Sequence, residues 1–177
     1  MAISPRKIRQ KRLEAARGYL QLGMPVQASR ELDKVPDSLR DNFDFQILKG
    51  ESLRESEQYA DAVDHFKEAL DLRPENLQGF LGLAWCYKRL DQLQAAIDTL
   101  EIGRTYHPDE SIVIYNLACY FSLQQNKSKA IECLGRSLRM EPDLVELIRD
   151  ETDFDSLRED PDFCFVISAV SSSDESS

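Results

Sequence analysis

Hydrophobic and polar side chains follow the period of an α-helix in the stretch YADAVDHFKEALDLRPEN, residues 59–76. Small and bulky apolar side chains share one stripe of this predicted helix, and Pro74 ends it. A helix with one apolar stripe must pack against other helices to stay folded in water. Weaker copies of the stretch recur later in the chain at a constant interval of thirty-four positions, which indicates a repeating unit.

Stepping by thirty-four positions from Phe43 places the starts of the other units at Arg9, Leu77 and Ser111, without insertion or deletion. Small residues occupy the eighth and twentieth places of all four units, and bulky apolar residues occupy the eleventh and twenty-fourth. Small side chains let two helices approach closely and bulky ones fill the space beside them, so each unit is predicted to be a helical hairpin. The small residues are Ala16, Gly50, Ala84 and Ala118, then Ala28, Ala62, Ala96 and Ala130, and the bulky ones are Tyr19, Leu53, Tyr87 and Phe121, then Leu32, Phe66, Leu100 and Leu134.

Prolines mark where the second helix of a unit ends, because Pro74, Pro108 and Pro142 all stand at the thirty-second place. The first unit departs from this pattern: Pro36 comes early and a different residue holds the thirty-second place. Its second helix is therefore predicted to be shorter, with residues 36–42 as a connector.

This pattern of small, bulky and proline positions resembles the tetratricopeptide repeat family, whose units are 34-residue helix-turn-helix hairpins. The resemblance divides residues 9–144 into units 9–42, 43–76, 77–110 and 111–144. It implies an all-α, right-handed superhelical solenoid of antiparallel hairpins, in which the first helix of each pair lines a concave groove.

The two ends extend beyond the repeats. Residues 1–8 form a lead-in, with Ser4 and Pro5 suited to cap the first helix. Residues 145–169 are predicted to form C-terminal capping helices, and the phrase LREDPDF resembles the closing segment of bacterial repeat proteins of this family. Residues 170–177 are predicted to be a disordered tail.

The expected closing segment has a short helix near 143–150, a second one from Asp153 to Arg158 capped by Thr152, and a third opened by Asp160 and Pro161. The alternative is a detachable acidic lid over the groove. The residues expected to cover the last repeat are Leu147, Phe154, Leu157, Phe163 and Val166.

Charge is distributed unevenly along the chain. Residues 141–177 carry the whole net charge of −10, whereas residues 1–20 carry a net charge of +5. The basic start could contact nucleic acid or anionic lipid, but an exposed basic face explains it more simply, and an acidic chain is a poor binder of polyanions. A nucleic-acid partner is therefore not expected. No apolar run reaches the length of a membrane span and the N-terminus lacks the apolar centre of a secretory signal, so the sequence predicts a cytoplasmic protein.

Candidate chemistry is sparse. The four cysteines and two histidines show no zinc-type spacing, so the cysteines are interpreted as reduced apolar fillers, with a redox or metal role as the alternative. No phosphate-binding loop, nucleotide fingerprint, metalloprotease motif or nucleophile elbow is present. The sequence therefore predicts no enzyme activity, no cofactor and no metal.

Function is instead expected in the groove. The family resemblance implies that the second, fifth, ninth, twelfth and thirteenth places of each unit face it. The fifth place is apolar in every unit, so these residues are equally interpretable as partial core. The predicted partner-binding residues are Leu13, Arg17, Ile47, Glu51, Arg54, Gln78, Leu81, Trp85, Lys88, Arg89, Ile112, Tyr115 and Cys119.

Trp85, the only tryptophan, is interpreted as an apolar anchor beside Tyr115 and next to a basic patch of Arg54, Lys88 and Arg89. A peptide with a bulky side chain followed by acids would suit such a surface. The alternative is that Trp85 is buried structure.

Chaperone-binding family members clamp a C-terminal carboxylate with Lys, Asn and Arg side chains, but this chain has Leu13, Arg17, Leu48, Gln78 and Gly82 at those places. Binding of Hsp70 or Hsp90 is therefore not expected. The sequence favours a non-enzymatic adaptor that binds a peptide or partner helix. The alternative is a chaperone like those of type III secretion translocators, which are also small, acidic repeat proteins. An enzyme subunit or nucleic-acid-associated factor is the weakest hypothesis.

Overall fold

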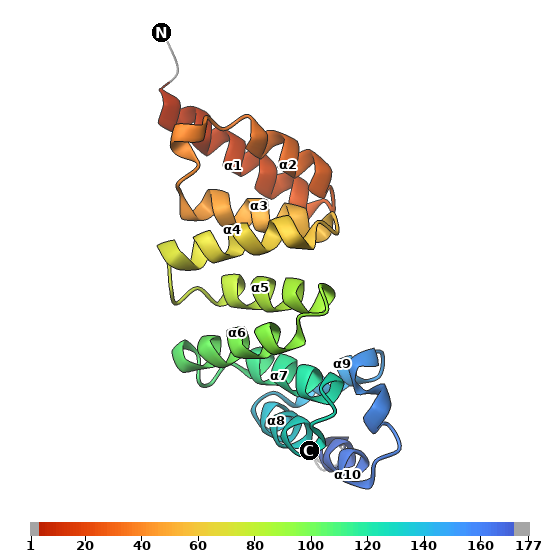
Figure 1. Cartoon of the computed structure of the whole chain (residues 1–177). Helices are drawn as coiled ribbons and strands as arrows, with labels where there is room; N and C mark the ends of the chain where they lie inside the picture. Colours follow the sequence, from red (N-terminus) through yellow and green to blue (C-terminus); the bar gives the residue numbers. More distant parts are fainter. Residues whose placement is uncertain (1–3, 172–177) are drawn as a thin grey trace. The chain divides into compact units, whose positions relative to one another are not determined.

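The computed structural model describes residues 4–171 of the 177-residue chain (Figure 1). The described residues form α-helices and 3-10 helices joined by turns and contain no strand, as the sequence predicts. They divide into two compact units between Gln92 and Leu93, and each is described separately. In the described part of the chain, no helix has both the length and the apolarity that crossing a membrane requires.

Unit 1 contains five α-helices that follow one another in chain order (Figure 1). Each helix packs on the next, and α1 also contacts α3, which also contacts α5. Helices α1, α3 and α5 therefore form one layer and α2 and α4 a second. The elements of unit 1 are α1 (Pro5–Gln21), α2 (Pro25–Asp33), η1 (Asp37–Leu39), α3 (Phe43–Glu55), α4 (Tyr59–Leu72) and α5 (Leu77–Arg89).

Unit 2 contains three longer helices followed by the closing segment. Helix α7 packs between α6 and α8, η3 packs on α7, and α10 packs on α8. The elements of unit 2 are α6 (Leu93–Tyr106), α7 (Ser111–Leu123), α8 (Lys127–Met140), η2 (Pro142–Leu144), α9 (Val145–Ile148), η3 (Thr152–Leu157) and α10 (Pro161–Ser171).

The helix bounds follow the sequence signals closely. Helices α3, α5 and α7 begin at the three repeat starts Phe43, Leu77 and Ser111. Helix α2 has 9 residues where α4 has 14, which confirms the shorter second helix of the first repeat. The division into four repeats remains our proposal, because the compact units divide within residues 77–110.

Each turn inside a hairpin carries one residue in the left-handed region, always at the fifteenth place of the repeat. These residues are Gly23, Glu57, Asp91 and Gln125, with φ between 60° and 65°. In each case the following N–H donates to a carbonyl five positions earlier, for example Gln58 N to Leu53 O at 2.9 Å. This bond satisfies a carbonyl at the helix end that would otherwise lack a partner. The sequence signals a turn midway through each unit, at 22–25, 56–59, 90–93 and 124–127, and the structure confirms these positions. The left-handed backbone was not predicted, because Glu57 and Gln125 are not residue types that signal it.

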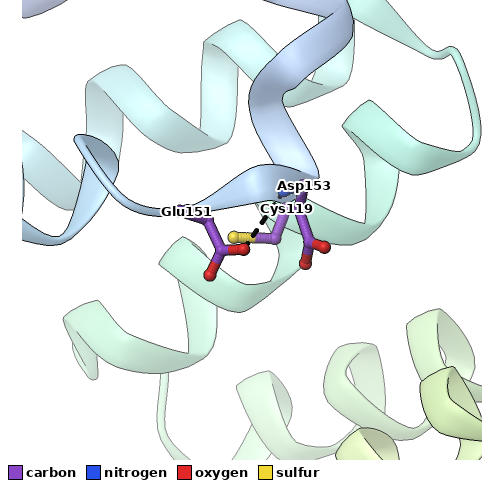
Figure 2. Close-up of side chains that lie close together, drawn as sticks. All are labelled: Cys119, Glu151 and Asp153. Carbon is purple, nitrogen blue, oxygen red and sulfur yellow. Dashed lines mark hydrogen bonds between the residues drawn. The ribbon is translucent and has the colours of Figure 1, made fainter.

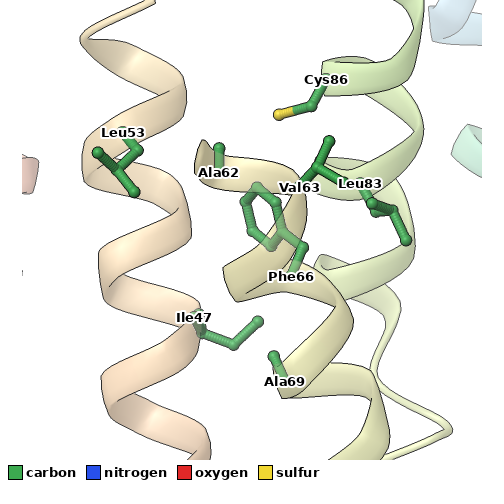
Figure 3. Close-up of a cluster of buried hydrophobic side chains, with 8 residues drawn as sticks. All are labelled: Ile47, Leu53, Ala62, Val63, Phe66, Ala69, Leu83 and Cys86. Atoms are coloured by element: carbon green, nitrogen blue, oxygen red, sulfur yellow. The ribbon is translucent and has the colours of Figure 1, made fainter. Parts of the chain in front are cut away.

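The core of unit 1 shows why small and bulky residues alternate. Phe66 on α4 is fully buried among side chains of α3 and α5 (Figure 3). Its ring lies so close to Gly50 on α3 and Gly82 on α5 that an added Cβ would meet ring atoms at 3.0 Å and 2.5 Å, respectively. Glycine at these two positions therefore allows the helices to close around one aromatic ring.

The closing segment differs from expectation in two details. Its 3-10 helix is capped by Glu151, whose side chain accepts from Asp153 N at 3.1 Å, and not by Thr152. Leu147 is 50% exposed, so the prediction that it covers the last repeat is wrong. Helix α9 is only one turn long, and Ile148 occupies its buried side instead. Phe154, Leu157 and Phe163 are buried and Val166 is half-buried.

At the N-terminus, the Ser4 side chain accepts from Lys7 N at 3.4 Å, which confirms the predicted cap. Helix α1 therefore begins inside the predicted lead-in, 1–8. Helix α10 reaches Ser171, inside the predicted disordered tail, and the rest of that tail lies outside the described residues.

Candidate functional site

A cleft of about 570 Å³ opens on the α1, α3 and α5 layer of unit 1. Its lining side chains all come from these three helices. The sequence predicted the first helix of each hairpin as the lining element, and within unit 1 this cleft follows that pattern. Five of the predicted partner-binding residues line it: Arg17, Ile47, Glu51, Arg54 and Gln78.

The cleft has an apolar floor and a polar rim. Ile47 and Leu48 are buried and form part of the floor. Arg17, Glu55 and Gln78 are exposed at the rim. Ile47 also belongs to the core around Phe66, so this fifth-place residue has both roles that the sequence left open.

Charged groups within the cleft are paired with one another. Arg54 contacts Glu51 through Nε at 2.8 Å and Nη2 at 2.5 Å, and its Nη2 lies 3.6 Å from Glu55. The other carboxylate oxygen of Glu51 accepts from Gln78 Nε2 at 3.3 Å, which links α3 to α5. Arg54 therefore does not add to a basic patch, contrary to the prediction, because its charge is balanced within α3.

Trp85 does not line the cleft, but it contacts Arg54, which does. Its half-buried ring meets the Tyr59 ring edge-to-face, with centroids 5.3 Å apart. The guanidinium groups of Arg54 and Arg89 lie 5.3 Å and 5.6 Å from the centroid of the Trp85 ring, and Arg89 also lies over Tyr59. Such cation–π contacts stabilise the ring in a half-buried position. The aromatic neighbour of Trp85 in unit 1 is thus Tyr59, which sequence reasoning missed.

The remaining predicted residues of unit 1 differ in exposure. Leu13 is 5% exposed and packs in the core of the first hairpin with Ala16 and Ala28, so its interpretation as core is correct. Leu81 and Lys88 are half-buried on α5.

In unit 2, two of the three predicted residues, Tyr115 and Cys119, lie under the chain's own closing segment, as Figure 2 shows for Cys119. Tyr115 is 4% exposed and Cys119 is 1% exposed. The Tyr115 ring meets the fully buried Phe154 ring edge-to-face, with centroids 6.0 Å apart. The prediction that Tyr115 and Cys119 face a partner is therefore wrong for this structure, because residues 151–157 cover them. Ile112 is half-buried.

Two of the cysteines have the environment of apolar fillers. Burial raises the pKa of the Cys86 thiol to about 12 and that of the Cys133 thiol to about 11, so both stay neutral near pH 7. Cys164 is exposed, and none of the four cysteines forms a disulfide in the structure.

These features define an all-α protein of stacked helical hairpins with a cleft on its first-helix layer. The chain belongs to the tetratricopeptide repeat family. Two family models, each described as tetratricopeptide repeat, match residues 53–118 and 113–144. The predicted family and its solenoid fold class are thereby confirmed.

Solved structures with the same fold support this assignment. A crystal structure of MamA protein has a TM-score of 0.79 at 16% identity, covering 96% of this chain and 93% of that one. MamA 41-end from Desulfovibrio magneticus RS-1 has a TM-score of 0.78 at 17% identity, covering 96% of both chains. YrrB, described as a TPR protein with an unusual peptide-binding site, has a TM-score of 0.70 at 20% identity, covering 76% of this chain and 70% of that one. A comparison with curated protein sequences gives no match.

Proposed function

We propose that this protein is a non-enzymatic interaction module that binds a peptide or a partner helix in the α1, α3 and α5 cleft of unit 1. The observation that carries the proposal is the cleft itself, with its apolar floor and exposed polar rim. Binding sites for peptides commonly combine an apolar pocket for anchor side chains with polar groups that fix orientation. YrrB, a protein of the same fold that has a peptide-binding site, adds support.

The closing segment suggests the chemistry of the occupant. In unit 2, the fifth-place residue Tyr115 contacts Phe154, and the ninth-place residue Cys119 lies near two carboxylates of the same segment. The chain thus covers these two places with an aromatic side chain flanked by acids. We propose that the partner offers a similar arrangement to unit 1, with a bulky side chain on the floor beside Ile47 and an acidic group near Arg17.

Arg17 is the residue of the cleft best suited to that acidic group. It is exposed, whereas Arg54 is already held by Glu51. Exposed Arg89, stacked on Tyr59 and Trp85, offers a second basic group beyond the cleft. The absence of Hsp70 and Hsp90 binding, the exclusion of nucleic acid and the cytoplasmic location stay predictions from the sequence.

Site-specific photocrosslinking in the native cell tests the proposal. A photoreactive amino acid replaces Gln78 at the rim of the cleft, and in a matched control it replaces Asp71, an exposed residue of α4 in the other layer. We expect discrete crosslinked proteins from position 78 and none of these from position 71. Equal crosslinking from both positions, or none from position 78, would remove the assignment of the cleft.

The identity of the captured protein also separates the two functional hypotheses. A membrane-disrupting translocator among the crosslinked proteins would favour the secretion-chaperone alternative. Other cytoplasmic proteins would favour a general adaptor.

Replacing Arg17 by Glu should weaken capture of an acidic partner by about tenfold, the loss expected for one charge-assisted contact.

A further inference from the structure

The last helix of the closing segment has an apolar face that the rest of the chain does not bury. Helix α10 carries no charged side chain from residue 163 to residue 171. Phe163 is buried, whereas Phe165, at 72%, is the most exposed aromatic ring among the described residues. Single exposed apolar residues are common, but an exposed aromatic ring on a helix without charges indicates a surface that another molecule covers.

This face adjoins a groove of about 420 Å³ between α8 and α10. The two helices run in the same direction along it, because Lys127 contacts Asp162 at one end, and a Cβ added to Gly135 would meet Val166 at 3.7 Å further on. The volume lies in the range of pockets that hold organic groups. The lining residues are Lys127, Ser128 and Ile131 of α8 and Asp162, Phe165 and Val166 of α10.

The two ends of the groove carry opposite charges. At the start of α10, Lys127 lies 2.6 Å from an oxygen of Asp160 and 3.0 Å from one of Asp162, so two carboxylates outweigh one ammonium group. The Asp162 side chain stays 70% exposed. At the other end, exposed Arg139 reaches over Gly135, where its Nη1 would lie 3.4 Å from an added Cβ. The first end is therefore acidic and the second basic.

We propose that a second copy of this chain covers this face, with its α10 antiparallel to the first α10 and its Phe165 in the groove. A two-fold symmetric contact requires a surface that complements itself. An antiparallel copy meets this requirement, because it brings the acidic start of each α10 to the basic end of the other groove. Asp162 of each copy then pairs with Arg139 of the other, and the dipoles of the two helices oppose each other favourably.

Small side chains on the same face allow the two helices to approach. Ser168 and Ala169 are exposed and follow Phe165 by three and four positions, which places them on the same side of α10. In an antiparallel pair, the Phe165 ring of one copy reaches the groove across these small residues of the other. The same combination of small and bulky residues closes the helical hairpins of the repeat.

The second α10 fits the groove better than the basic helix α1 of another copy would. All exposed residues of α1 other than Pro5 are polar, so α1 offers no bulky anchor. A second α10 supplies an acidic residue and an aromatic anchor one helical turn apart, Asp162 and Phe165.

The contact is small. One 11-residue helix offers less area than the about 800 Å² per partner of a standard interface, so we expect a weak dimer that dissociates on dilution. In the dilute monomer the exposed Phe165 ring contributes little to folding. The contact uses residues of unit 2 and does not depend on the cleft of unit 1, but a dimer would present two such clefts to a partner.

Sedimentation velocity of the full chain tests the proposal, with a phosphine reductant present to exclude disulfide dimers through exposed Cys164. The wild type should change from monomer to dimer as its concentration rises towards about 1 mM. Phe165→Ala should weaken dimerisation at least about tenfold. Leu147→Ala, at another exposed apolar position of the closing segment, should leave it unchanged. A wild type that stays monomeric, or Phe165→Ala that dimerises as well as the wild type, would overturn the proposal.

Charge exchange tests the antiparallel arrangement. Asp162→Arg and Arg139→Asp should each weaken dimerisation about tenfold, because each brings like charges together across the interface. The double variant restores opposite charges and should recover most of the affinity, which effects within one chain would not produce. Circular dichroism checks that each variant is folded. A double variant as weak as the single ones would contradict the contact. A monomeric wild type that crosslinks a different protein from a photoreactive residue at position 165 would assign the groove to a foreign partner instead.

Discussion

Gly82→Ala should destabilise unit 1 although alanine is the better helix former. A Cβ at this position would lie 2.5 Å from Phe66 Cζ and 2.6 Å from Cε1, where ordinary carbon contacts lie at about 3.5 to 4.0 Å. The ring would have to withdraw by about 1 Å. It cannot withdraw freely, because it is fully buried and Gly50 lies against it on α3.

The magnitude follows from two opposing effects. Overpacking of a buried ring costs about 2 to 3 kcal/mol, and replacing a helical glycine by alanine returns about 1 kcal/mol. The expected net loss is about 1 to 2 kcal/mol in the free energy of unfolding. Gly18→Ala is the matched control, because nothing lies within 4 Å of the added Cβ on α1. It should gain up to about 1 kcal/mol.

Urea unfolding followed by the fluorescence of Trp85, the only tryptophan, measures both variants within unit 1. The midpoint should fall for Gly82→Ala and rise for Gly18→Ala, with unchanged slopes. In a Phe66→Leu background the penalty of Gly82→Ala should largely disappear. A rise for Gly82→Ala comparable with that of Gly18→Ala would refute the view that two glycines close around Phe66.

Three further predictions concern the closing segment, the thiols and pH. Phe154→Ala should lower the free energy of unfolding by about 3 to 5 kcal/mol, measured by urea unfolding followed by circular dichroism. Phe165→Ala, at a 72% exposed position, should change it by less than about 0.5 kcal/mol. Similar values for both variants would show that the closing segment is not a cap. A thiol reagent should modify one cysteine of the folded protein and four after unfolding. In Cys164→Ser it should modify no cysteine of the folded protein. Modification of a second thiol in the folded wild type would contradict the burial of the other three cysteines. Burial, with a smaller contribution from the nearby positive charge of Lys49, lowers the pKa of His65 below 6.5. The folded state therefore favours the neutral ring, and stability should fall as pH drops below 6.5. His65→Gln should lessen that pH dependence, and an unchanged slope would show that another group causes it.

The repeat could be predicted from the sequence, because a contact that recurs in each unit, such as Phe66 between small residues, requires the same residue type at the same place. The left-handed conformation of the turn residues could not be predicted in every repeat, since Glu57 and Gln125 have no side-chain feature that marks it. In these turns the backbone hydrogen bonds hold the residue in the left-handed conformation.

The sequence predicted the part of the candidate site that follows from the packing of neighbouring first helices in the repeat. Arg17, Ile47 and Gln78 line the cleft because helices α1, α3 and α5 follow the repeat. The covering of Tyr115 and Cys119 could not be predicted, because it depends on how a non-repeating segment folds back on α7. The pairing of Arg54 with Glu51 could not be predicted either, because Arg54 has several charged neighbours and sequence spacing alone does not decide which of them it contacts.

Hydrogen exchange of unit 1 with and without the crosslinked partner tests the central claim most directly. If the partner occupies the cleft, amide exchange should slow in residues 17–21 and 43–55, which carry most of its lining, and stay unchanged in α4. Slowed exchange confined to α2 and α4, with 43–55 unaffected, would show that the partner binds the other layer and that the cleft is not the binding site.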